Sequence, residues 1–373
     1  MLKHLSLVAL TLMVTAAATF AQSPAPAASS APGSFKIGIM TGTVSQGEDE
    51  FRGAQMVDKA FPGMIKHVTY PDNFMQEQET TISQVAALAA DPTIKAIVIA
   101  QAVPGSVAAV KKAKATRPDL LFFLVDPHED TPVVNQVADF AIQPDQIARG
   151  TSIIQMANKM GAKKFVHYSF PRHMSQEPLS RRRDRMKEEC AKLGMEFIDA
   201  TAPDPMRESG VAGAQQFIKE DVPRMVQKYG KKVAFFSTNC GMQEPLIKAT
   251  MDTGAYFPEQ CCPSPTHGYP GALGLSIPPE KAGDIPFISE QIKAKVAEAE
   301  RSGHFATWKI AGNIVAIRAC VELAKKAIEG TLKLSDEKAV QAELERIAGA
   351  KIQLAKWDKT GNYYLFLAES IIF

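Results

Sequence analysis

The sequence is poor in cysteine, in net charge and in long hydrophobic runs. The first two of these each exclude a class of protein. Five cysteines in 373 residues are too few for a scaffold held together by disulfides. A formal charge of +2 provides no strong field to attract nucleic acid or an anionic membrane. Because 46% of the residues are hydrophobic, the chain can still bury sizeable cores.

Catalytic signatures are absent from the sequence as well. It contains no GxSxG elbow, no GxGxxG loop, no HExxH pair and no CxxC pair. We therefore expect neither an enzyme activity nor a cofactor.

The N-terminus has the pattern of a secretory signal peptide. Lys3 and His4 precede the apolar run 5–14, which is too short to span a membrane, and small residues lead up to Ala21. We expect residues 1–21 to be removed on export and residues 22–34, rich in proline, alanine and serine, to form a linker. The mature protein would then be periplasmic, without stable insertion into the membrane.

Strand-like apolar runs alternate with helical patterns along the rest of the chain, which is typical of βαβ units and parallel sheets. The predicted strands of the first half are 35–40, 65–70, 94–100, 120–125 and 138–142. The pattern then restarts, with predicted strands at 161–170, 195–200, 233–236 and 259–262, and with a closing hairpin of 351–357 and 363–366. We therefore predict an α/β fold with two similar halves.

The stretch 233–254 carries the clearest signal for a site. Its buried strand is followed by Ser237, Thr238 and Asn239, and a helix begins near Pro245. In open α/β sheets, ligands bind beyond the carboxyl ends of the strands. Asn239 and Cys240 therefore stand where a small molecule would be held.

Four segments within residues 35–330 carry a family pattern in their order and spacing. They are FKIGIMTGTVSQG, IKAIVIAQAVPGSVAAVKKAKATRPDLLFFLVD, DFAIQPDQIARGTSIIQMANKMGAKKFVHYS and FFSTNCGMQEPLIKATMDTG. Together they resemble the class I periplasmic solute-binding proteins that serve sugar and nucleoside ABC importers. The segments FVHYSFPRHMSQEPLSRRRDRMKEEC and EQCCPSPTHGYPGALG are more narrowly similar to a bacterial subfamily known only as a domain of unknown function.

This resemblance implies two Rossmann-like lobes with parallel sheets, joined by a multi-strand hinge. The N-terminal lobe would take residues 35–143 and about 311–335, and the C-terminal lobe would take residues 144–310. Residues 336–373 would return across the hinge.

By position, the resemblance also implies a set of ligand-binding residues. They are Thr41, Thr43, Ser45, Gln101, Asp126 and His128 in the first lobe, and Ser169, Arg172, Arg181, Asn239, Cys240, Ser264 and His267 in the second, with Trp308 on the hinge side. Cys240 departs from the family, which often has Asn-Asp at this strand end. A nucleoside-like or other ring-bearing ligand, or a small carboxylate, is therefore expected rather than a plain hexose.

The arginines at 181–183 leave two interpretations open. An arginine fork would match a carboxylate or phosphate on the ligand, and any one of the three could face the cleft. Asp184 and Glu188 equally suit a solvated helix face on which the arginines find ion-pair partners.

The cysteines also leave alternatives. Strands ending at Cys240 and beginning near residue 259 would be neighbours about 4.8 Å apart, which allows a disulfide from Cys240 to Cys261 or Cys262. The sharper alternative is a soft-metal site of Cys240, one cysteine of that pair and His267. We predict the disulfide and no metal.

Together these features predict an exported, monomeric receptor that captures a small polar ligand and delivers it to an ABC-importer permease. One alternative is a ligand sensor for a membrane signalling receptor. Another is a periplasmic thiol or metal-site protein built on Cys240, Cys261, Cys262 and His267.

Overall fold

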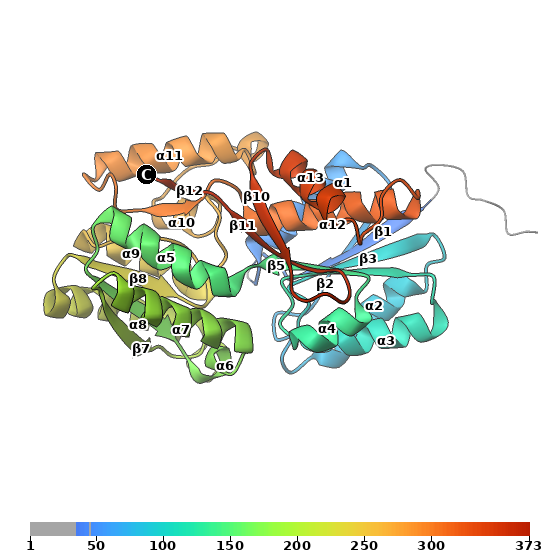
Figure 1. Ribbon diagram of the computed structural model, residues 1–373, viewed down its shortest axis with the longest axis horizontal. Coiled ribbons are helices and arrows are strands. Elements are labelled where there is room, and N and C mark those ends of the chain that lie inside the picture. Colours follow the sequence, from blue (N-terminus) through green and yellow to red (C-terminus); the bar gives the residue numbers. More distant parts are fainter. Residues whose placement is uncertain (1–34, 45) are drawn as a thin grey trace, which may run out of the picture. The chain divides into compact units, whose positions relative to one another are not determined.

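The computed structural model describes residues 35–44 and 46–373. The predicted signal peptide 1–21, the predicted linker 22–34 and Ser45 lie outside the described residues. The strands form a seven-stranded sheet, a three-stranded sheet and a two-stranded ribbon, all within the unit Phe35–Phe373 (Figure 1). Among the described residues, no helix combines the length and the apolar character needed to cross a bilayer.

The seven-stranded sheet has the order β10-β11-β5-β4-β3-β1-β2, and all its strand pairs are parallel except β10 with β11. Its strands are β1 (Lys36–Thr41), β2 (Ile65–Thr69), β3 (Ile94–Ala100), β4 (Leu121–Val125), β5 (Phe140–Pro144), β10 (Ile352–Lys356) and β11 (Tyr363–Ala368). The predicted strands of the first half and the predicted closing hairpin are all confirmed.

Both faces of this sheet are covered by helices, which explains why its strands are continuously apolar. The helices are α1 (Glu48–Ala60), α2 (Gln78–Ala89), α3 (Ser106–Thr116), α4 (Thr131–Val137), α12 (Gly312–Ile328) and α13 (Glu337–Ala348). Ile39 and Val98 belong to the core shared with α1, α12 and α13. Ile97 and Ile99 belong to the core shared with α2, α3 and α4.

The three-stranded sheet is parallel, in the order β7-β6-β8. Its strands are β6 (Lys164–Ser169), β7 (Glu196–Thr201) and β8 (Val233–Ser237). One face packs on α5 (Gln146–Met160) and α7 (Glu177–Lys192), and the other on α8 (Gly210–Tyr229) and α9 (Gln243–Thr253). Buried residues of α11 (Ile285–Glu298) belong to the same core as α8 and α9. Short helical turns are α6 (Pro171–Met174), η1 (Cys240–Met242), α10 (Tyr269–Ala272) and η2 (Pro279–Lys281).

One predicted strand is wrong. Residues 259–262 form a loop, and β8 has only an isolated bridge from Ala234 to Tyr256 on that side. The carbonyl oxygens of Gln260 and Cys261 accept hydrogen bonds from the guanidinium of Arg149, at 2.7 and 2.9 Å. Because a side chain takes these acceptors, they are not free for a strand ladder.

The chain crosses three times between the part that contains the seven-stranded sheet and the part that contains the three-stranded sheet and the two-stranded ribbon. It leaves β5 for α5, returns from β9 (Ala306–Trp308) to α12, and leaves β11 for β12 (Ser370–Ile372). Strands β9 and β12 pair antiparallel with each other beside α10 (Figure 1). The residue boundaries given above for the two lobes stay a prediction.

Candidate functional site

The strand ends of both large sheets line one pocket of about 150 Å³. The first sheet contributes the residues that follow β3, β4 and β5, and the second contributes those that follow β6 and β8. The residues with polar or thiol side chains that line the pocket include Gln101, Asp126, His128, Gln146, Arg172, His173, Arg182, Thr238, Asn239, Cys240, Cys261 and Cys262. This is the sheet edge at which α/β proteins bind ligands.

Several residues expected to bind ligand do line this pocket. They are Gln101, Asp126, His128, Arg172, Asn239 and Cys240. Asn239 also caps the turn η1, because its Oδ1 accepts the backbone N–H of Gly241 at 2.9 Å. Their contact with a ligand stays a prediction.

The other expected residues lie away from the pocket lining, and each described one has its own protein partner. The pairs are Thr41 with His67 (2.8 Å), Thr43 with Asp72 (2.5 Å), Ser169 with Thr238 (2.9 Å), Ser264 with Thr266 (2.5 Å), His267 with Cys261 (3.8 Å), and Arg181 with Glu177 (3.2 Å). Trp308 is 1% exposed and packs against Phe366, with ring centroids 5.5 Å apart.

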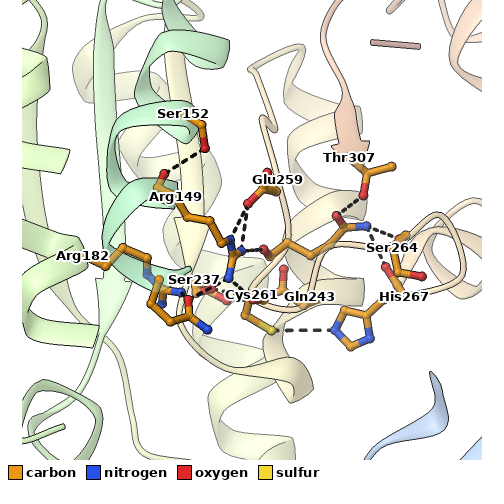
Figure 2. A network of polar contacts seen from close by, with 12 residues as sticks. Arg149, Ser152, Arg182, Ser237, Gln243, Glu259, Cys261, Ser264, His267 and Thr307 are labelled. Carbon is orange, nitrogen blue, oxygen red and sulfur yellow. Dashed lines mark hydrogen bonds and ion pairs between the residues drawn. The ribbon is translucent and has the colours of Figure 1, made fainter. Parts of the chain in front are cut away.

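Arg149 on α5 is a fully buried cation with a complete set of partners (Figure 2). Its Nε and Nη2 both lie 2.8 Å from Oε1 of Glu259. The same guanidinium donates to the carbonyls of Gln260 and Cys261, and its Nη1 donates to Oε1 of Gln146 at 2.8 Å. Arg149 therefore fixes the loop that carries Cys261.

Arg182 on α7 is equally buried, with 1% of its surface exposed, but its partners are incomplete. Its Nη1 donates to Oε1 of Gln146, and its Nε and Nη2 are buried without a hydrogen-bond partner. Within residues 35–44 and 46–373, no carboxylate forms an ion pair with it. Burial, and then the charge of Arg149, lower the pKa of Arg182 to about 9, so it is a cation at neutral pH.

The helical phase of α7 decides which arginine reaches the pocket. Leu179, Arg182, Met186 and Cys190 are spaced by three or four residues and share one helix face. That face is buried, whereas the side chain of Arg181 is 51% exposed. The apolar stripe in the sequence was therefore the signal that distinguishes Arg182 from its neighbours.

The ends of β3 and β4 have a strained backbone. Gln101 and Asp126 have φ angles of 58° and 46°, in the left-handed region that side chains rarely adopt. Such strain is concentrated at functional sites. Burial, and then the charge of Cys262, raise the pKa of Asp126 to about 7, although Arg149 and Arg182 oppose this shift. Asp126 therefore changes its charge near neutral pH.

Two pocket histidines are neutral hydrogen-bonding groups. Burial, and then the charge of Arg172, lower the pKa of His128 to about 4 and that of His173 well below its usual value. Nδ1 of His173 lies 3.0 Å from Oγ1 of Thr238. Arg172 itself is occupied by a bidentate pair with Asp204, with both contacts at 2.8 Å.

Gln146, His173 and Thr238 also line the pocket, although they were not among the residues predicted to bind ligand. Thr238 directly follows β8, so the strand-end rule could have included it. Gln146 and His173 begin or lie within helices, and no pattern in the sequence marks them.

Three thiols converge at one wall of the pocket. Sγ of Cys240 lies 3.2 Å from Sγ of Cys261 and 3.4 Å from Sγ of Cys262. Sγ of Cys261 lies 3.8 Å from Nε2 of His267 (Figure 2). All are free cysteines, so the predicted disulfide is not formed here and stays a prediction for the oxidised protein. Burial alone would raise the pKa of Cys261, but hydrogen bonds from the other two thiols and two nearby guanidiniums lower it well below its usual value.

Comparisons with solved structures confirm the fold. A chain described as a proposed transcriptional regulator from Clostridium difficile 630 matches with a TM-score of 0.77 and 23% identity, over 91% of this chain and 99% of that one. A sugar ABC transport substrate-binding protein from Bordetella parapertussis 12822 matches with a TM-score of 0.57 and 12% identity, over 91% and 88%. A carbohydrate transporter from Acidothermus cellulolyticus 11B matches with a TM-score of 0.52 and 11% identity, over 81% and 90%. The chain has the class I periplasmic binding protein fold.

Comparisons at the level of sequence establish the family. Two uncharacterized proteins of Treponema pallidum (strain Nichols) are 38% and 36% identical to this chain, over 178 and 216 residues. These matches cover 46% and 58% of this chain, and 80% and 97% of the relatives. The family model described as "Protein of unknown function (DUF3798)" matches residues 35–306, which is most of the chain. The protein therefore belongs to the DUF3798 family.

Proposed function

We propose that this protein is an exported solute-binding receptor that captures a small anionic solute and delivers it to an ABC importer. The observation that carries the proposal is Arg182, a buried cation in the pocket wall whose Nε and Nη2 have no partner. A buried charge is costly unless it is paired. The two free donors of a guanidinium match the two oxygens of a carboxylate or one edge of a phosphate.

The lining of the pocket supports binding as the role. Residues from the ends of five strands converge there, and ligands that contact two lobes stabilise their closed arrangement. Several proteins of the same fold are described with bound polyols or sugars, namely myo-inositol, allitol and D-allose. A receptor that closes on its ligand needs no catalytic step.

The chemistry of the pocket favours a small carboxylate over a nucleoside or a hexose. Its free volume of about 150 Å³ is less than the roughly 300 Å³ at which pockets for larger ligands begin. One cation, Arg182, is unpaired, and the neutral side chains of His128 and His173 can hydrogen bond to hydroxyl or carbonyl groups. We therefore propose a ligand of a few carbons with at least one carboxylate.

The first experiment is native mass spectrometry of the freshly purified protein, followed by denaturation and identification of any released compound. A small organic acid in one-to-one ratio would support the proposal. Protein that carries no organic compound, and that shows no thermal shift with any small carboxylate, sugar or nucleoside, would overturn it.

Calorimetric titration of the ligand then tests the role of Arg182. Loss of a charge-assisted hydrogen-bond pair costs about 1.5–3 kcal/mol, so Arg182→Gln is expected to weaken binding by roughly 10- to 150-fold. Arg181→Gln is the matched control, because the neighbouring side chain is exposed, and it should bind like the wild type. Equal affinities of the wild type and Arg182→Gln would refute the assignment. Delivery is tested separately, by loss of uptake of the identified ligand in a deletion strain.

A further inference from the structure

We propose that Cys240, Cys261 and His267 form a binding site for a thiophilic d¹⁰ cation, Cu⁺ or Zn²⁺, at the wall of the pocket. One ligand atom from each, two Sγ and one Nε2, all lie within 4.8 Å of one another. Thiolate and imidazole are the ligands that these ions prefer in proteins. The site needs no organic ligand, but it shares the pocket and the nearby cation Arg182 with the proposed solute-binding site.

The distances between the ligand atoms are close to those that a metal ion requires. Bonds of about 2.3 Å to sulfur and about 2.0 Å to nitrogen place ligand atoms roughly 3.5–4 Å apart. The Cys240–Cys261 sulfurs are 3.2 Å apart, and Sγ of Cys261 is 3.8 Å from Nε2 of His267. Sγ of Cys262 lies 3.4 Å from Sγ of Cys240, so a third sulfur is close to the site.

The loop that carries two of the ligands is held from both sides, as a metal site requires. The buried side chain of Gln260 donates to the carbonyls of Ser264 and His267, at 2.7 and 3.1 Å. Its Oε1 accepts from the hydroxyl of Thr307 at 2.6 Å. From the other side, Arg149 donates to the carbonyl of Cys261. Cys261 and His267 are therefore fixed relative to each other before any metal arrives.

The charges around the site favour Cu⁺ over Zn²⁺. Two thiolates with Cu⁺ carry a net charge of −1, whereas two thiolates with Zn²⁺ are neutral. Arg182 lines the same pocket as a cation without a carboxylate partner among the described residues. A negatively charged Cu⁺–thiolate unit therefore complements the field of Arg182 better than a neutral zinc unit does.

The test uses the full exported chain, reduced and kept anaerobic, with no organic solute added. Thiol titration first counts the five cysteines, and native mass spectrometry then follows addition of Cu⁺ or Zn²⁺. We expect one equivalent of metal, with Cu⁺ retained more strongly against a chromogenic chelator. X-ray absorption should show sulfur neighbours at about 2.3 Å. A reduced protein that binds neither ion overturns the proposal, whether or not all five thiols titrate.

Variants assign the ligands. Cys240→Ser and Cys261→Ser are each expected to weaken metal binding by more than about 100-fold, and His267→Gln by about 10- to 100-fold. Cys190→Ser is the matched control, since that thiol lies in the core on α7 and burial raises its pKa to about 12. The control should bind metal like the wild type. Unchanged binding by a Cys240→Ser/Cys261→Ser double variant, or an equal loss in the control, would overturn the assignment.

Discussion

Arg149 and Arg182 occupy comparable places and have opposite surroundings. Both lie on helices that cover one face of the three-stranded sheet, both are essentially unexposed, and both donate to Oε1 of Gln146. Arg149 also has a carboxylate, Glu259, and two backbone carbonyls. Arg182 has no further hydrogen-bond partner among the described residues.

This difference separates a cation with a complete set of partners from one with two donors that lack a hydrogen-bond partner among the described residues. The partners of Arg149 compensate for its loss of hydration and hold the loop 259–262 in place. The guanidinium of Arg182 lies over the ring of Phe236, 4.9 Å from its centroid, but its Nε and Nη2 have no hydrogen-bond partner. Under the proposed function, these are the two donors that an anion in the pocket would use. We therefore expect Arg149 to be a structural residue, whereas Arg182 is the residue proposed to bind ligand.

The largest expected effect is on stability, at Arg149. Arg149→Met leaves Glu259, which is 2% exposed, as a buried charge without its partner. Breaking a buried pair in this way costs about 3–5 kcal/mol. Urea denaturation of the ligand-free protein measures the change in the free energy of unfolding. Arg181→Met, at an exposed position, is the control and should change it by less than about 0.5 kcal/mol.

A second prediction contrasts Arg182 with Arg149 in the same measurement. Because Arg182 has no carboxylate partner to leave behind, Arg182→Met should leave the ligand-free protein about as stable as the wild type, or more stable by about 1 kcal/mol. A loss of stability as large as that of Arg149→Met would mean that Arg182 is a structural residue, and the comparison would fail.

A third prediction concerns the pH dependence of binding and Asp126. Above pH 7 Asp126 ionises and competes with a bound anion for Arg182, whereas below pH 7 it is largely neutral. The affinity for a carboxylate ligand should therefore fall as pH rises from 6 to 8. The decrease is up to about tenfold for each unit by which the bound anion raises the pKa of Asp126. Asparagine tolerates the left-handed backbone of position 126 and does not ionise. The Asp126→Asn variant should therefore bind with an affinity that is nearly independent of pH. An unchanged pH dependence in this variant would show that another group titrates.

The repeating secondary structure was predictable because it depends on short-range patterns. Runs such as Ile94–Ala100 and Val233–Ser237 are almost continuously apolar, so both sides of each strand are apolar. A strand covered by helices on both faces requires this pattern. The strand-end rule then selects Gln101, Asp126 and Asn239 without any knowledge of the ligand. All three line the pocket.

The failures have one physical cause in common. Cys240 and Cys261 were expected to meet across neighbouring strands, and they meet instead through a loop whose carbonyls are bound by Arg149. Trp308, expected on the hinge side of the cleft, is buried against Phe366, and its contact with a ligand stays a prediction. These positions depend on contacts between residues far apart in the chain, and local patterns carry no information about such contacts.

The sequence by itself determined the α/β alternation, the two parallel sheets and the ends of strands at which a ligand would bind, because hydrophobic period and turn residues act over a few positions. Only the tertiary structure decided that Arg182 is the unpaired cation and Arg149 the paired one. Burial, hydrogen bonding and charge balance are properties of the assembled neighbourhood, and the partners Gln146 and Glu259 come from other segments of the chain.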